Sequence, residues 1–244
     1  MDDYFSALTI RKIDNGFARQ FMCKHHYTKS CAKCTIAYGV YYNNELQCVV
    51  VYGQPSGKNL ASSIWKGGNE KECLELLRLF SFDGCPKNTE SWSISHSIKC
   101  LRQDMPEVKV LVSYADTSAG HIGYIYQASS WSYIGSGSKE RKIFIDGVRQ
   151  HRRNLYDKYG TSSIEQLKEK LGDRLVVDNE RQGKNKYIKI IADKNKIKKL
   201  LKVNILPYPK GDISYYNDEE NEYSSINGVL LSSSPSMQQQ SFFD

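Results

Sequence analysis

The order of apolar and polar residues predicts alternating strands and helices over the first 138 residues. Two runs rich in Val, Ile and Tyr within residues 34–55 are separated by Asn43-Asn44, which tolerate turn geometry, so this segment predicts a β-hairpin. The apolar runs at 74–82 and 107–115 are typical of strands. The other elements predicted in this part are a helix over 91–103, a shorter helix over 120–129 and a strand over 131–137.

The pattern changes after residue 138. Ser162 and Glu165 have the spacing of a capping box, the apolar residues that follow keep a helical spacing, and Gly172 marks the end of this helix. The other elements predicted here are strands over 173–179 and 185–193, joined by a polar turn, and a lysine-rich helix over 194–202. From Gly211 onward, Ser, Asn, Gln and acidic residues dominate, which predicts a disordered tail.

These elements predict an α/β protein with a mixed sheet flanked by helices. We expect a catalytic domain over residues 1–138, a basic α+β extension over 139–210 and a flexible acidic tail over 211–244. The full length of 244 residues allows a substantial core without disulfides or a structural metal. The sequence contains no P-loop, no nucleotide-binding glycine fingerprint and no HExxH zinc helix.

The net charge of +7 is unevenly distributed. Residues 139–210 contain 20 Lys and Arg against 9 Asp and Glu, a net charge of +11, whereas residues 211–244 contain six acids and no Lys or Arg. A basic segment of this density suits a polyanion such as double-stranded DNA, because Lys and Arg neutralise phosphates and release counterions. The alternative is a solvated helix face with ordinary surface lysines.

The seven cysteines and the N-terminus favour an intracellular location. No run approaches the roughly 18 apolar residues that span a bilayer, and the first residues are too polar for a signal peptide. We therefore expect a cytoplasmic protein with reduced thiols. One cluster could also bind a metal such as zinc, with half-buried thiols as the alternative: Cys23, His25 or His26, Cys31 and Cys34.

Two polar positions are notable because of the strands that carry them. Asp116 follows a predicted buried strand at the edge where α/β sheets bind ligands, although a helix N-cap would also explain an aspartate there. Arg78 lies inside an apolar strand, so its guanidinium needs a carboxylate or phosphate partner. A buried ion pair with Glu75 or Asp116 is the structural alternative to a functional role.

Six short segments occur in a defined order along the chain, at residues 25–30, 52–55, 75–79, 86–91, 113–116 and 120–131. Their order resembles that of the Mom family of phage proteins, and the resemblance spans about residues 20–136. It implies a variant of the GNAT acyltransferase fold. It also implies transfer of a small acyl-type group, methylcarbamoyl or acetamido-like, to N6 of adenine in DNA, which protects phage DNA from restriction in the host cytoplasm.

The resemblance also implies the catalytic residues, which are His26, Tyr27, Arg78, Asp116 and Tyr126. Asp116 would act as general base or orient the amine. His26 would shuttle protons near neutral pH, and Tyr27 would donate a hydrogen bond. Arg78 and Tyr126 match active-site positions of the family.

In GNAT proteins, the strand that corresponds to residues 74–82 here leads into a glycine-rich turn, where backbone amides hold the pyrophosphate of the donor. The corresponding stretch here, 86–91, lacks Gly-x-Gly, but Lys87, Asn88 and Ser91 at a helix start could still hold a phosphate. The implied donor is acetyl-CoA or a related acyl donor, and a zinc or iron ion stays open.

Modification of N6 requires the adenine to leave the duplex, at a cost that stacking in an aromatic pocket offsets. Tyr124, Tyr126, Trp131 and Tyr133 cluster after Asp116 and predict such a surface, with a place in the core as the alternative for each ring. DNA contacts are therefore expected at Trp131 and Tyr133, and in the basic extension at Arg149, Arg152 and Arg153.

The end of the tail resembles the short peptide that binds bacterial sliding clamps. Gln239, Ser241, Phe242 and Phe243 fit its spacing, although Gln240 and Phe242 replace the usual Leu. A tail that docks on its own core, or a chance match, would explain the same residues.

Two other functions are compatible with the sequence. One is a GNAT acyltransferase for a protein or small-molecule amine, which would not need the basic segment. The other is a non-enzymatic DNA-binding protein on a decayed acyltransferase fold, for which the predicted catalytic residues would be dispersed in space.

Overall fold

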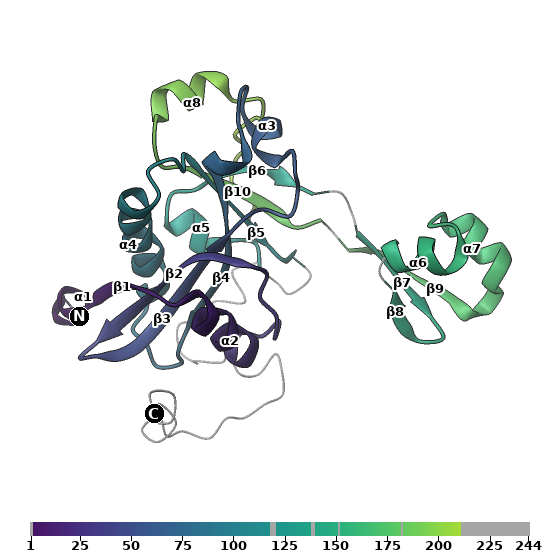
Figure 1. Ribbon diagram of the computed structural model, residues 1–244, viewed down its shortest axis with the longest axis horizontal. Helices are drawn as coiled ribbons and strands as arrows, with labels where there is room; N and C mark the ends of the chain where they lie inside the picture. The colour runs from purple at the N-terminus through teal and green to yellow at the C-terminus, as the bar shows by residue number, and fades with distance from the viewer. Residues whose placement is uncertain (1, 118–120, 138–139, 151, 182, 211–244) are drawn as a thin grey trace. The chain divides into compact units, whose positions relative to one another are not determined.

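The fold is built on a seven-stranded mixed sheet with helices on both faces (Figure 1). The computed structural model describes residues 2–117, 121–137, 140–150, 152–181 and 183–210. The strand order is β1-β2-β3-β4-β5-β10-β6. These strands are β1 (Thr9–Ile13), β2 (Cys34–Tyr42), β3 (Glu45–Gly53), β4 (Cys73–Ser81), β5 (Val110–Ala115), β6 (Ser132–Ser136) and β10 (Asn185–Ile190).

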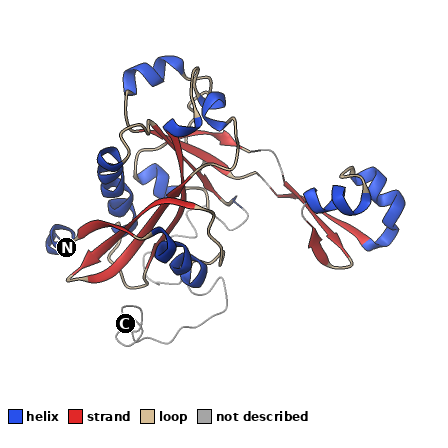
Figure 2. Cartoon of the chain, in the orientation of Figure 1, coloured by secondary structure: helices blue, strands red, loops and turns tan. Residues whose placement is uncertain are grey.

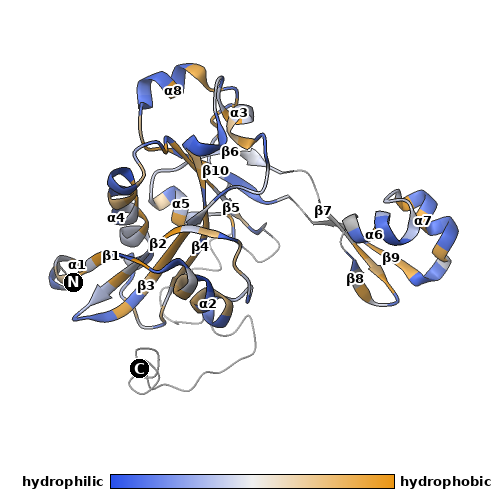
Figure 3. Ribbon diagram, viewed as in Figure 1, coloured by the Kyte–Doolittle hydropathy of each residue, from blue (hydrophilic) through white to orange (hydrophobic). Residues whose placement is uncertain are grey.

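Helices cover the two faces of this sheet with separate apolar clusters (Figure 2). Helix α4 packs against one face, whereas α2, α3 and α8 pack against the other. Figure 3 shows the apolar residues concentrated along the strands, as the burial of the sheet on both faces requires. The helices of this part are α1 (Asp2–Ala7), α2 (Asn15–His25), α3 (Leu60–Ile64), α4 (Thr89–Asp104), α5 (Tyr124–Ala128) and α8 (Lys194–Leu200), with the short 3₁₀ turn η1 (Glu70–Glu72).

The predicted hairpin is confirmed as β2 and β3. Asn43 and Asn44 join the two strands with φ angles of 48° and 65°. Positive φ at both central residues matches the right-handed twist of the flanking strands, and Asn tolerates it better than most residues. The strands predicted at 74–82, 107–115 and 131–137 are also confirmed, as are the helices at 91–103 and 194–202.

Strands β4 and β5 are the parallel pair of the sheet, and they remain together over a short distance. Their register has three residue pairs, Cys73 with Val110, Leu74 with Leu111 and Glu75 with Val112. Both strands continue beyond this point, but they no longer pair with each other. The Leu76 carbonyl instead accepts a hydrogen bond of 3.0 Å from the Ser113 hydroxyl, which bridges the start of the separation.

The central sheet does not end with the domain boundary expected at residue 138. Strand β10 comes from the predicted basic extension, yet it pairs antiparallel with both β5 and β6. Its Tyr187 and Ile188 side chains are buried, which explains why a segment with several lysines belongs to the sheet. The strands predicted at 173–179 and 185–193 therefore lie in different sheets.

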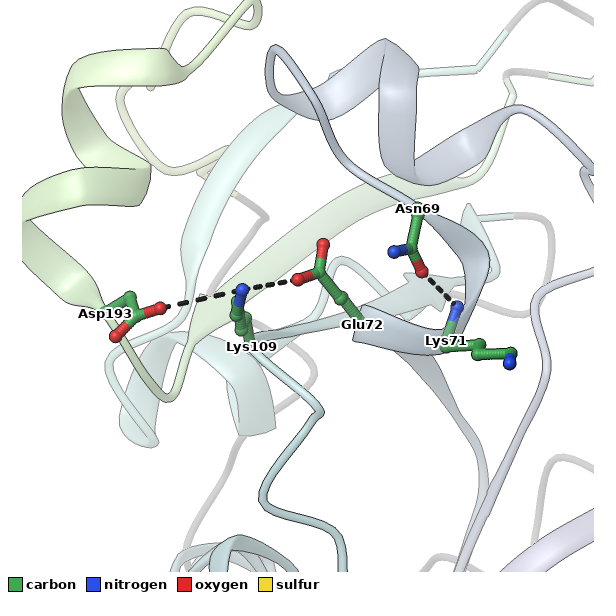
Figure 4. Close-up of polar contacts among 5 residues, drawn as sticks. All are labelled: Asn69, Lys71, Glu72, Lys109 and Asp193. Atoms are coloured by element: carbon green, nitrogen blue, oxygen red, sulfur yellow. Dashed lines mark hydrogen bonds and ion pairs between the residues drawn. The ribbon is translucent and has the colours of Figure 1, made fainter.

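An ion-pair network secures the start of β5 and the start of α8 (Figure 4). The Lys109 ammonium contacts the Glu72 carboxylate and lies 3.6 Å from the Asp193 carboxylate. The backbone of Ile191 also donates to the Lys109 carbonyl at 2.8 Å. These contacts attach the end of β10 to the end of β5 opposite Asp116.

A small lobe is inserted in the sequence between β6 and β10. Its sheet has the order β8-β7-β9, and its own apolar cluster contains Ile143, Leu155 and Leu167. The predicted helix is confirmed as α7 and ends at Gly172, but its N-cap is Ser163 and not Ser162. The lobe consists of β7 (Glu140–Ile145), β8 (Val148–Gln150), α6 (Arg152–Tyr159), α7 (Ile164–Leu171), the 3₁₀ turn η3 (Gly172–Arg174) and β9 (Leu175–Arg181).

Three further features concern the tail, the cysteines and the length of the helices. The tail over 211–244, with the clamp-like residues, is not described. All seven cysteines are unpaired. Among the helices of the described residues, none combines the length and the apolar character that a membrane span needs.

The helix predicted at 120–129 is observed as α5, which begins only at Tyr124 because Gly123 is its N-cap. Gly123 caps α5 with φ 97° and ψ 32°, and a Cβ atom there would lie 2.4 Å from the Tyr187 ring. Tyr187 in turn donates a 2.6 Å hydrogen bond to the Ile122 carbonyl. Close packing of Gly123 on Tyr187 therefore sets where α5 begins.

Gly123→Ala should destabilise the protein more than Gly67→Ala. Both residues have positive φ, but a Cβ at Gly67 meets nothing within 4 Å. Gly67→Ala should cost about 1 kcal/mol from backbone strain alone, whereas the clash with Tyr187 should add about 1–3 kcal/mol at Gly123. Urea unfolding of the two variants measures the difference, and equal losses would contradict this packing.

Candidate active site

The separation of β4 and β5 places several polar residues around one gap. An irregularity between β3 and β4 makes Leu77 an extra residue in β4, so Leu76 pairs with Tyr52 and Arg78 with Val51. Gly53 makes room for this, because a Cβ there would lie 2.4 Å from the Leu77 side chain. Such a bulge redirects the residues that follow, here Arg78.

The Arg78 guanidinium is held by backbone carbonyls. Its Nε donates to the Ser30 carbonyl at 2.9 Å, and Nη1 donates to the Leu77 carbonyl at 2.6 Å. Within the described part of the chain no ion pair between Arg78 and Glu75 is found. Since a guanidinium has five N–H groups, donors remain for an anionic or carbonyl ligand.

His26 ends α2 and lies beside Arg78. Its side chain is 8% exposed, and the backbone N–H of Thr28 donates to Nδ1 at 3.2 Å. Burial, with the nearby charges of Arg78, His121 and Lys29, lowers the pKa of His26 to about 4. The ring is therefore neutral at pH 7, and its Nδ1 also lies 2.9 Å from the Thr28 hydroxyl oxygen.

Tyr27 connects His26 with the loop after β5. Its ring lies 4.4 Å from the His26 ring and 5.9 Å from the His121 ring, measured between centroids, and its side chain is 53% exposed. Burial and the Asp116 carboxylate raise the pKa of Tyr27, while Arg78 lowers it. The Asp116 carboxylate therefore lies close enough to Tyr27 to affect its pKa.

Tyr126 closes the gap on the face covered by α4. Its hydroxyl oxygen is 2.8 Å from the Ser113 hydroxyl. The single proton of the Ser113 hydroxyl is shared between the Tyr126 oxygen and the Leu76 carbonyl, which lies 3.0 Å away. Burial, followed by Tyr27 and Glu75, raises the pKa of Tyr126 to about 12, partly offset by the contact with Ser113.

Glu75 is a candidate functional residue that the sequence analysis considered only as an ion-pair partner. It belongs to the last pair between β4 and β5, at the apex of the gap. Burial raises the pKa of Glu75 to about 7, although Arg78 and Lys184 oppose this shift. A carboxyl group that titrates near neutral pH within a site can accept a proton. The only signal in the sequence was a charged residue within an apolar strand.

The structure thus brings the five predicted catalytic residues together. Ring contacts and mutual effects on pKa connect His26 with Tyr27 and Arg78, Tyr27 with Asp116, and Tyr126 with Tyr27. Helix α2, strand β4, the end of β5 and helix α5 each contribute one part of this group. Such an arrangement of neutral donors, a guanidinium and carboxyl groups can orient an amine and stabilise a developing negative charge.

The predicted donor-binding residues lie at the start of α4, beyond the end of β4. Asn88 is the N-cap with φ 75°, a left-handed conformation that glycine usually provides. The Ser91 hydroxyl donates to the Asn88 carbonyl at 3.0 Å, Lys87 is exposed, and Glu90 accepts a 3.0 Å hydrogen bond from Ser81. The first amides of a 16-residue helix therefore accompany Lys87 at this edge.

The predicted DNA-binding residues divide into separate groups. Trp131 is completely buried against Tyr126, so it packs in the core and cannot stack on a base in this conformation. Tyr133 is half-buried, and its hydroxyl donates to Asn185 at 3.3 Å. Arg149 belongs to β8 and Arg152 and Arg153 to α6, but their side chains lie outside the described residues.

The predicted metal cluster does not assemble in the described part of the chain, where no group of three or more His, Cys, Asp or Glu side chains could hold an ion. His25 stacks on Phe21 with ring centroids 4.5 Å apart. The Cys34 thiol donates to Asn15 at 3.3 Å, and burial raises its pKa to about 11. Cys23 is exposed, and Cys31 is half-buried.

Comparison with known proteins gives a consistent family relationship. A model of the Mom protein family matches residues 7–210. The methylcarbamoylase Mom of Escherichia phage Mu is 29% identical over 210 residues, which cover 83% of this chain and 84% of that protein.

Solved acetyltransferases show partial similarity. An N-acetyltransferase from Staphylococcus aureus Mu50 is 12% identical with a TM-score of 0.40, covering 76% of this chain and 99% of that one. A GNAT family acetyltransferase from Elizabethkingia anophelis, solved with acetyl-CoA bound, is 14% identical with a TM-score of 0.38, covering 75% and 98%. TM-scores of this size are too low to assign a shared fold.

Glu75→Gln should change how stability depends on pH. The pKa of Glu75 is raised from 4.5 to about 7 in the folded state, so the unfolded chain loses this proton first and stability falls as pH rises through that window. The lowered pKa of His26 acts in the opposite sense, since stability falls as pH drops from 6.5 towards about 4.

The free energy of unfolding of Glu75→Gln, relative to wild type, should therefore increase between pH 4.5 and 7 and then level off. Urea unfolding at half-unit steps of pH measures this difference. A difference that stays constant from pH 4.5 to 8 would show that Glu75 titrates as an ordinary carboxylate.

Proposed function

The chain belongs to the Mom protein family, and we propose that it transfers a small acyl-type group, methylcarbamoyl or acetamido-like, to N6 of adenine in DNA. The relative from phage Mu is named as a methylcarbamoylase, which supports this type of group. In this proposal the modified adenine protects phage DNA from restriction nucleases, and the enzyme acts in the cytoplasm of the host cell.

The main support for the proposal is that His26, Arg78, Asp116 and Tyr126 lie around one gap. The chain that contains them belongs to the Mom family. A non-enzymatic DNA-binding protein on a decayed fold would not require these residues to converge. A GNAT acyltransferase for protein or small-molecule amines would not require the basic segment 139–210. Both alternatives are therefore less well supported than DNA modification.

The N6 amine is a weak nucleophile, because its lone pair is delocalised into the adenine ring. We assign Glu75 as the group that accepts the N6 proton as the new bond forms. Asp116, beside Tyr27, would orient the amine by accepting its second N–H. This division of roles follows from the position of Glu75 at the apex of the gap.

The neutral donors stabilise charge on the opposite side of the reaction. When bound, an acyl donor supplies an electrophilic carbonyl carbon and a leaving group. The remaining N–H groups of Arg78 and the Nε2–H of His26 can donate to the carbonyl oxygen as negative charge develops there. The Tyr126 hydroxyl, 2.8 Å from Ser113, is proposed to hold the reacting groups in place on the α4 side.

The donor is proposed to be acetyl-CoA or a related acyl donor that binds at the start of α4. The amides of the first helical turn and Lys87 can hold a phosphate there. Asn88 supplies the left-handed conformation that the missing Gly-x-Gly would provide, and hydrogen bonding of Glu90 to Ser81 directs its carboxylate to β4. These observations support a phosphate-bearing donor.

Double-stranded DNA is the proposed substrate, and two basic regions can contact it. Of the +11 charge over residues 139–210, residues 139–184 carry +4 and residues 185–210 carry +7. We propose that Arg149, Arg152 and Arg153 of the lobe contact phosphates outside the flipped base. The tail residues Gln239, Ser241, Phe242 and Phe243 are proposed to bind a sliding clamp, which would raise the local enzyme concentration on replicating DNA.

Arg78→Ala, Asp116→Asn, Tyr126→Phe and Glu75→Gln should each abolish the modified nucleoside. The four side chains act on one reacting centre, so a double variant should be little worse than either single variant. The measurement is mass spectrometry of nucleosides from the DNA of cells that express each variant. In vitro, wild-type product formation should rise with pH through about 7, because Glu75 must be ionised to accept a proton.

Matched controls use the same exchanges away from the gap. Tyr41→Phe and the exposed Arg102→Ala should retain the product, since neither residue lies at the separation of β4 and β5. Activity near wild type in two of the four site variants would exclude this assignment of the active site.

Charge reversal at Arg152 and Arg153 should weaken DNA binding and reduce its salt dependence. Each phosphate contact contributes about 0.9 to the slope of log K against log salt, so loss of two contacts should lower the slope by about 2. Fluorescence anisotropy with labelled duplex at several salt concentrations measures this, with Lys99 and Arg102 reversed on α4 as the control. Unchanged affinity and slope would place the DNA outside the lobe.

A further inference from the structure

A basic and aromatic strip lies on the face of the sheet opposite α4. Lys186, Ile188 and Ile190 of β10 pair with Tyr114, Val112 and Val110 of β5. Because side chains alternate along a strand, these residues share one face of the sheet. Val112 and Ile188 belong to the apolar cluster that α3 and α8 cover.

Helices α3 and α8 cover only part of this strand face. Val112 and Ile188 are buried, whereas Tyr114 and Lys186 are half-buried and Lys184 is exposed. The same strand face therefore changes from apolar and covered to aromatic, basic and open towards the end of β5. Asp116 follows immediately after this open part.

The strip is continuous with the gap between β4 and β5. The Lys186 ammonium lies 5.9 Å from the centroid of the Tyr114 ring. The positive charge of Lys184 opposes the raised pKa of Glu75, and the Glu75 carboxylate contributes to raising the pKa of Tyr114 to about 12. Lys184, Tyr114 and Glu75 are thus close enough to influence one another.

We propose that Lys184, Lys186 and Tyr114 bind the DNA strand beside the extruded adenine, with the two lysines on consecutive phosphates. This inference rests on the proposed function and deepens it by locating the path of the target strand. A base that leaves the stack draws its flanking backbone to the protein, so the mouth of the site needs cations. The Tyr114 ring provides an apolar surface for the sugar or a base.

The strip and the proposed donor-binding site lie on opposite faces of the sheet. The start of α4, where a donor phosphate is proposed to bind, belongs to the helix that covers the other face of the sheet. The gap between β4 and β5 opens between these two faces, so an acceptor from one side and a donor from the other could meet at Glu75. Lys184 also offsets the charge of Glu75, which would otherwise repel a phosphate.

The test compares Lys184→Gln/Lys186→Gln with Lys194→Gln/Lys196→Gln, which removes the same charge from the exposed start of α8. The probe is labelled duplex DNA with one mismatched adenine, titrated at several salt concentrations. The first variant should lower the slope of log K against log salt by about 2, whereas the second should leave it unchanged. Lys184→Gln alone, at an exposed position, should lower the slope by about 1 and serves if the double variant is unstable.

Coenzyme A is the second probe, because its phosphates could bind the same lysines. Its affinity should be equal for wild type and Lys184→Gln/Lys186→Gln, and a loss of coenzyme A affinity with normal DNA binding would overturn the inference. An equal loss of slope in both lysine variants would also overturn it, because it would indicate diffuse attraction. If the wild type modifies DNA and all lysine variants bind DNA normally, the inference about the strip is wrong but the proposed function stands. If the wild type neither binds nor modifies DNA, the proposed function itself is wrong.

Discussion

The short parallel contact between β4 and β5 is the constraint on which the site depends. Parallel strands make evenly spaced hydrogen bonds, so their separation after Glu75 leaves backbone groups that need other partners. The Ser113 hydroxyl satisfies the Leu76 carbonyl, and Ser113 then positions Tyr126. On the β3 side, the bulge at Leu77 directs Arg78, whose guanidinium donates to the Leu77 carbonyl. The positions of Arg78 and Tyr126 are thus tied to the early end of one strand contact.

Burial around this gap sets the protonation states that the chemistry needs. Desolvation disfavours charge, so it lowers the pKa of His26 and raises that of Glu75, and both groups tend towards the neutral form. The Arg78 guanidinium lies near them, and the backbone carbonyls of Ser30 and Leu77 accept its hydrogen bonds. The result is a neutral donor, a permanent cation and a weakly acidic carboxyl group within one site. Such a set can transfer a proton near neutral pH without a large net charge.

The sequence predicted the elements whose residues determine them locally. Asn43-Asn44 define the hairpin, and continuous apolar runs define β4 and β5, whereas the spacing of Ile94 and Leu101 defines α4. Strand β10 was recognised as a strand, but its place in the central sheet depends on long-range pairing with β5, which a local pattern does not contain. The helix α2 was missed, because its first turn has few apolar residues and its capping residue Asp14 stands alone in the sequence.

The family resemblance supplied the candidate residues around the gap, whereas the role of other residues depends on burial, which the local sequence does not show. Nothing in the local sequence distinguishes Trp131, which is fully buried, from the half-buried Tyr133 two residues later. The cysteines near His25 have a metal-like spacing, but packing of His25 on Phe21 and burial of Cys34 remove that possibility. Glu75 was considered only as a partner for Arg78, since its pKa depends on desolvation by elements far apart in the chain.

The division of the sheet into two faces relates the charge pattern to the reaction. A transferase for DNA must admit a large, stiff polyanion and a small donor to the same atoms, and two substrates that both carry phosphates repel each other if they enter side by side. Entry from opposite faces through a gap in the sheet reduces this repulsion. It also explains why part of the positive charge of residues 139–210 lies beside and within β10, a strand of the central sheet, and not only in the inserted lobe. The lobe can then add affinity along the duplex, while the sheet itself determines where the target base enters.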